Sequence, residues 1–155
     1  MRALFVTLSL LLSGAGCAQS VWLELGPAYL EVRGEERSSY QATFKFGLRG
    51  LLPIGERNSL YLAPHIYTSG SAGLDGGLWI RFPSDLEDVE GLSSYAGAGL
   101  ALERGAFGLV LSAGLSYELN RDLSVAFVYT HRPLLIPRLS QTFDLSAGLA
   151  LRLGN

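Results

Sequence analysis

Large apolar side chains alternate with small or polar ones along most of the later part of the chain, over 107–119, 123–131 and 143–153. A period of two indicates β-strand, because successive side chains leave opposite faces of a pleated chain. These three segments are therefore predicted strands with two chemically different faces. The apolar face of the first holds Phe107, Leu109, Leu111, Ala113, Leu115, Tyr117 and Leu119.

The opposite face is built mainly from glycine, alanine and serine, with isolated charges. In the first segment it holds Gly108, Val110, Ser112, Gly114, Ser116 and Glu118. A face turned to bulk water would favour longer polar side chains, whereas a cramped interior needs small ones. We therefore interpret the large apolar face as outward, toward lipid, and the small polar face as the lining of a narrow lumen.

Eight such segments are predicted along the chain, and turn residues separate them. The clearest turn is Asn120-Arg121-Asp122, between two strongly alternating runs. Most segments are near the ~9–11 residues that a tilted strand needs to cross a bilayer. The expected fold is all-β, a closed eight-stranded antiparallel up-and-down transmembrane β-barrel over 19–155. Its strands are predicted at roughly 20–32, 39–52, 59–68, 73–82, 93–103, 106–119, 123–132 and 141–153.

Three places depart from the regular pattern. The first strand is predicted to lose phase near Pro27 and Leu30, and Pro64 predicts a bulge or a weak ladder in the third. The longest connection, 83–92, carries four acids. An even strand count puts both chain ends on one side, expected to be the periplasm, where barrels of this kind keep their turns short.

The first 18 residues have the composition of a secretory signal peptide. Arg2 supplies the positive charge, the segment 3–12 is apolar, and small residues surround Cys17. Cleavage after Ala18 is expected. The alternative is that Cys17, the only cysteine, becomes a lipid-modified amino terminus. We divide the chain into a signal peptide, 1–18, and a barrel, 19–155.

The composition fits a membrane barrel better than a soluble domain. Hydrophobic residues make up 48% and charged residues 17%, where about a quarter is usual for charged residues. Beyond the amino terminus no segment reaches the ~18 continuous apolar residues of a membrane helix. The formal net charge of −2 provides no basic footprint, so no nucleic-acid partner is expected.

Acids and bases on the predicted inner face nearly cancel. The lumen of an eight-stranded barrel is just wide enough for its own side chains. An unpaired buried ion costs on the order of several kcal/mol, so these charges should pair into a plug. A gated ion path is the alternative. The predicted lumen charge network is Glu24, Lys45, Arg49, Asp75, Arg81, Glu103, Glu118, Asp144 and Arg152, with Arg132 at its rim.

The pattern of the whole mature chain resembles the small eight-stranded outer-membrane barrels that include the OmpA membrane domain and OmpX-like proteins. The run 114–129 is similar to their penultimate hairpin. The chain end is similar to the terminal signal that barrel-assembly machinery reads, but it continues to Gly154-Asn155 where family members usually finish on an aromatic residue. The resemblance implies a place in the cell outer membrane. The residues that match the terminal signal are Ser146, Gly148, Leu151 and Leu153.

Two histidines are candidate site residues. Some small outer-membrane barrels modify lipid A with a His and a Ser at the outer rim, and His131 lies toward that end. Position 133 is Pro, where the deacylase pattern has Ser, and only Ser140 could approach from the next strand. His65 is expected to make a lumen hydrogen bond with Tyr61 and Tyr67 nearby, and not to bind metal. No catalytic residue, metal or cofactor is therefore predicted.

The apolar run between Arg132 and Arg138 is a candidate contact site for lipid or for an envelope protein. Its central residues, Leu134, Leu135 and Ile136, could instead extend the flanking strands.

The expected function is a structural or interaction role for an outer-membrane barrel with a plugged polar lumen. Outer-membrane lipid and the assembly machinery are the expected partners, and an envelope protein is a further candidate. The alternatives are a soluble secreted barrel that binds a small apolar ligand, and a rim enzyme that acts on outer-leaflet lipid.

Overall fold

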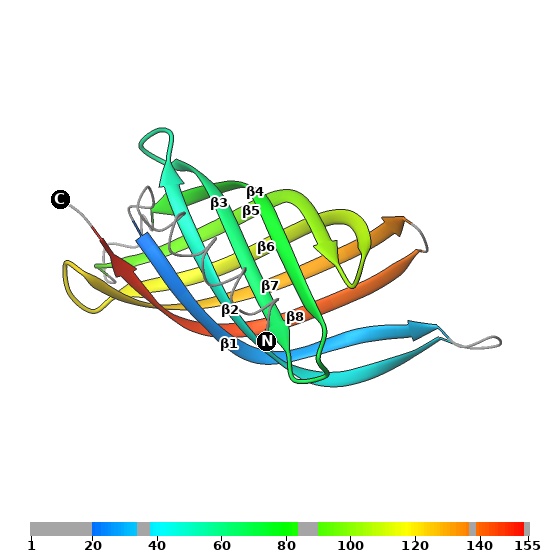
Figure 1. Cartoon of the computed structure of the whole chain (residues 1–155). Coiled ribbons are helices and arrows are strands. Elements are labelled where there is room, and N and C mark those ends of the chain that lie inside the picture. Colours follow the sequence, from blue (N-terminus) through cyan, green and yellow to red (C-terminus); the bar gives the residue numbers. More distant parts are fainter. Residues whose placement is uncertain (1–19, 34–37, 84–89, 137–138, 154–155) are drawn as a thin grey trace.

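The computed structural model describes residues 20–33, 38–83, 90–136 and 139–153. These residues form eight strands that pair antiparallel in chain order and close through β1 and β8 (Figure 1). The closed eight-stranded barrel predicted from the sequence is confirmed. The strands are β1 (Ser20–Arg33), β2 (Ser38–Pro53), β3 (Asn58–Tyr67), β4 (Ala72–Pro83), β5 (Leu92–Glu103), β6 (Ala106–Glu118), β7 (Leu123–Ile136) and β8 (Ser140–Arg152).

The two faces sort as the alternation predicts. On β6 the side chain of Leu111 is 50% exposed on the outside, while its neighbours Val110 and Ser112 are buried in the lumen. The same rule holds on β8, where Leu149 is exposed and Ser146 is buried. Large apolar side chains therefore cover the outside of the barrel. Across the described ranges, no helix is long and apolar enough to cross a membrane.

The prediction that the first strand loses phase near Pro27 is wrong. In β1 the alternation continues, with Tyr29 outward and Ala28 and Leu30 buried inside. Leu30 is inward because this end of the lumen has an apolar lining, in which it packs with Ala28 and Tyr67. A bulky apolar residue on the inner face made the pattern look broken.

Pro64 interrupts the ladder between β2 and β3 without changing its register. Gly47 pairs with His65 and Gly50 with Leu62 in one continuous register, and no paired residues lie between them. Proline has no N–H to donate, so the gap is expected at this position. The weak ladder is therefore observed, while the irregularity in register lies elsewhere, between β6 and β7 at Phe107.

Strand β1 begins and strand β8 ends at the same end of the barrel, where Ser20 pairs with Arg152. We call this end the chain-end mouth and the opposite end the far mouth. At the far mouth the β1–β2 hairpin projects beyond its neighbours, and its ladder continues to the pair Arg33 and Ser38 (Figure 1). The predicted signal peptide and most of the 83–92 connection lie outside the described residues.

Candidate functional site

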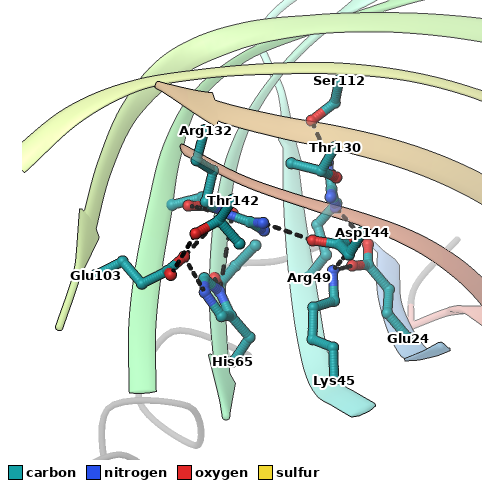
Figure 2. Close-up of polar contacts among 12 residues, drawn as sticks. Glu24, Lys45, Arg49, His65, Glu103, Ser112, Thr130, Arg132, Thr142 and Asp144 are labelled. Carbon is teal, nitrogen blue, oxygen red and sulfur yellow. Dashed lines mark hydrogen bonds and ion pairs between the residues drawn. The ribbon is translucent and has the colours of Figure 1, made fainter. Parts of the chain in front are cut away.

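Arg132 is the centre of a cluster of ion pairs inside the barrel (Figure 2). Its guanidinium donates from Nε and Nη2 to the carboxylate of Asp75, at 3.0 and 2.7 Å. Its Nη1 donates to Asp144, and its Nε lies 3.8 Å from Glu103. The side chain is 0% exposed, so one cation from β7 joins carboxylates from β4, β5 and β8.

A second set of ion pairs continues the cluster toward β1 and β2. Lys45 donates to Glu24 at 3.0 Å and to Asp144 at 2.8 Å. Arg49 donates from Nε to the other oxygen of Glu24, at 2.6 Å. Asp144 therefore bridges Lys45 and Arg132, and the two sets form one network.

His65 lies between two carboxylates on the other side of the cluster. Its Nδ1 is 3.8 Å from Asp75 and its Nε2 is 3.7 Å from Glu103. Glu103 also accepts hydrogen bonds from the Tyr67 hydroxyl at 3.0 Å and from Thr142 at 2.8 Å. The histidine thus belongs to the inner face, as predicted, and the described residues contain no group of side chains able to hold a metal ion.

An aromatic layer separates this cluster from the chain-end mouth. Trp22, Trp79 and Tyr95 contact one another with ring centroids 5.4–5.9 Å apart. The guanidinium of Arg49 lies over the Trp79 ring, 4.1 Å from its centroid, on the side that faces the ion-pair cluster. Gly97 leaves space for this packing, because a Cβ there would lie 2.5 Å from the ring of Trp79.

Between the aromatic layer and the chain-end mouth lies a cavity of about 450 Å³. Arg81 lines it and contacts Glu118 at 3.3 Å, while Arg152 lies 4.0 Å from the same carboxylate oxygen. The side chains of Arg81 and Arg152 are 40% and 53% exposed. Arg81 also donates to the hydroxyl of Ser93 at 3.1 Å.

The predicted charge network therefore divides into two groups. Arg81, Glu118 and Arg152 lie at the mouth, apart from the buried cluster. Six predicted members lie in the cluster, and the centre is Arg132, which the sequence placed at the rim. That placement is corrected because β7 continues to Ile136 and carries Arg132 into the interior. The six are Glu24, Lys45, Arg49, Asp75, Glu103 and Asp144.

The apolar run after Arg132 extends β7, as the alternative interpretation held. Leu134 is 2% exposed and packs inside the barrel, so it does not belong to an outer contact surface. Leu135 and Ile136 are exposed at the far mouth. The expected contact site is reduced to these two side chains.

His131 lies on the outer side of β7 and its Nε2 is 3.3 Å from the Oε1 of Gln141. Ser140 pairs with Leu134, whereas His131 pairs with Phe143. Side chains three residues apart in a strand lie on opposite faces, so Ser140 points into the barrel while Phe143 points outward. The ladder does not bring His131 and Ser140 together as a catalytic pair.

The barrel resembles solved structures of small outer-membrane proteins. Neisserial surface protein A matches with a TM-score of 0.62 and 15% identity, over 86% of this chain and 97% of that chain. Ail, the attachment invasion locus protein of Yersinia pestis, matches with 0.56 and 12%, over 88% and 99%. The outer membrane enzyme PagL matches with 0.56 and 12%, over 86% and 99%.

No protein-family model matches the sequence, and no curated protein matches it at a significant level of similarity. At these identities the structural likeness shows the fold, that of a small eight-stranded outer-membrane barrel. The resemblance noted in the sequence is confirmed at this level.

Proposed function

We propose that this protein is a non-conducting outer-membrane barrel with a structural or interaction role in the cell envelope. The observation that carries the proposal is the buried ion-pair cluster. Lys45, Arg49 and Arg132 are 0–1% exposed, and each is bonded to a carboxylate from another strand. Side chains bonded across the lumen in this way support a lumen that is closed to ions and solutes.

The outer surface supports a place in the lipid bilayer. Exposed leucine, phenylalanine and tyrosine side chains occur on all eight strands, as on a barrel that faces hydrocarbon. A soluble barrel that binds an apolar ligand would need the reverse arrangement, with apolar residues inside and charges outside. The buried charges at Asp75 and Asp144 argue against that alternative.

The placement of His131 and Ser140 supports a structural or interaction role over a rim enzyme. His131 contacts Gln141, and Ser140 belongs to the other face of its strand. Leu135 and Ile136, exposed at the far mouth, are better candidates for function because they offer an apolar contact. We propose outer-leaflet lipid or an envelope protein as what they contact, and the barrel-assembly machinery as the partner during insertion.

Conductance across a planar bilayer tests the proposal. The folded protein, identified by its altered gel migration before boiling, is expected to give no channel steps. The Arg132→Ala/Asp75→Ala double variant removes two bonded side chains and should show measurable current if it folds. A matched Arg104→Ala variant changes an exposed charge at the far mouth and should stay silent. Regular channel steps from the unaltered protein would overturn the closed-lumen proposal, and identical migration with and without boiling would overturn the barrel in the membrane.

A further inference from the structure

The cavity at the chain-end mouth has a feature that lumen closure does not require, namely an excess of cationic side chains. Among the residues that the structure describes, Arg57, Arg81, Arg121 and Arg152 line it, against three acids, Glu56, Glu118 and Asp122. Glu118 is shared between Arg81 and Arg152, at 3.3 and 4.0 Å. One carboxylate between two half-exposed guanidinium groups leaves donor capacity that can bind a further anion.

The floor of the cavity is apolar and aromatic, with Trp22, Trp79 and Tyr95 in its lining. The indole N–H of Trp79 is buried and, within the described residues, has no hydrogen-bond partner. Directly behind that ring lies Arg49, whose Nη1 is likewise buried without a partner in the described part of the chain. Exposed guanidinium groups above an aromatic floor with an unused N–H donor favour a ligand with both a flat apolar part and a negative charge.

The cavity opens along the barrel axis and not toward the lipid. All eight strands contribute lining residues, so its wall is closed on every side. A volume of about 450 Å³ is within the usual range for small-molecule sites. The ligand therefore enters from the aqueous side of the chain-end mouth.

We propose that this cavity binds a small soluble organic anion. Its carboxylate or phosphate group contacts Arg81 and Arg152, and its apolar part packs on Trp22 and Tyr95. This site goes beyond the closed-lumen role and does not depend on it, because the cavity lies outside the ion-pair cluster.

Tryptophan fluorescence reports on this cavity alone, because Trp22 and Trp79 are the only tryptophans in the chain. The barrel in phosphatidylcholine nanodiscs is titrated with 4-bromobenzoate, a heavy-atom quencher, and with the neutral 4-bromobenzamide. We expect saturable quenching by the carboxylate and only linear collisional quenching by the amide. Identical, unsaturable quenching by both would overturn the proposal.

Variants locate the anion. The Arg81→Gln/Arg152→Gln double variant should weaken bromobenzoate binding by about tenfold or more, since two charge-assisted contacts are lost. Glu118→Gln removes the competing carboxylate and should tighten binding. Arg104→Gln, at the far mouth, is the matched control and should leave binding unchanged, with folding of each variant checked by gel migration.

An anionic lipid headgroup carries the same negatively charged group as a soluble anion. A second experiment distinguishes these two ligands. Replacing part of the phosphatidylcholine with phosphatidylglycerol should leave bromobenzoate binding unchanged if the ligand is soluble. Competition by phosphatidylglycerol would overturn the soluble ligand in favour of a headgroup. An unchanged affinity in the double variant would overturn the assignment to Arg81 and Arg152.

Discussion

The two halves of the lumen use the same kinds of side chain with opposite results. In the cluster around Arg132 every ion pair is buried, and carboxylates from several strands share three cations. At the chain-end mouth Arg81, Glu118 and Arg152 are also paired, but their side chains are 37–53% exposed to solvent. Burial decides what a pair does, because a buried charge without its partner is costly whereas an exposed one is hydrated.

The largest effect is expected from removing the cation of the buried half. Arg132→Leu leaves Asp75 and Asp144 without their main partner, and breaking a buried pair in this way costs about 3–5 kcal/mol. Urea unfolding in lipid vesicles, followed by gel migration, measures the loss. A cost below about 1 kcal/mol would mean that the cluster behaves like the solvated mouth.

A cation introduced on the outer face extends the comparison of paired and unpaired charges, because the hydrocarbon offers it neither water nor a carboxylate. Leu111→Arg places a cation on the outer face near the middle of β6, with an expected cost of about 2–4 kcal/mol. Leu119→Arg, just beyond the end of that strand, is the matched control, with a cost of about 0–1 kcal/mol. Equal costs for the two variants would contradict the placement of this face in the lipid.

The aromatic layer between the two halves should respond to a single added methyl group. Gly97→Ala brings a Cβ against the ring of Trp79, and such overpacking costs about 1–3 kcal/mol. Gly76→Ala is the control, because its Cβ would meet neighbours at ordinary contact distances of 3.5 and 3.6 Å. Tryptophan emission and the urea unfolding midpoint should both shift in Gly97→Ala and stay unchanged in Gly76→Ala.

The smallest effect is expected at the chain-end mouth. Arg81→Gln breaks the pair with Glu118, and a pair exposed to this degree contributes about 0–1 kcal/mol. The same urea titration measures it beside Arg132→Leu. A loss as large as that of the buried variant would remove the distinction between the two halves.

Much of the fold follows from the alternation of residue types. Each predicted strand end is within one residue of the observed one, except that β7 continues to Ile136 and was predicted to end at residue 132. The extension was missed because proline at 133 is unfavourable in a strand and the bulky Leu134 looks unlike the small inner face. Leu134 is accommodated there since the far part of the lumen is lined by apolar side chains as well.

The site was harder to predict than the strands. Alternation identifies which side chains point inward, but not their height along the barrel axis, which depends on the stagger between strands. Arg81 and Arg132 both point inward, yet one lies at the mouth and the other in the cluster. Only the register of neighbouring strands decides which acid each arginine can reach.

The closure of β1 onto β8 has a consequence for biogenesis. Val21 pairs in the ladder with Leu151, almost the full length of the chain away. Until that final segment arrives, two ribbon edges have bare amide and carbonyl groups, which hydrocarbon cannot solvate. For the proposed barrel in the bilayer, insertion would therefore wait for the last strand, and a helper that shields both edges meanwhile would determine whether the ring closes or the polypeptide aggregates.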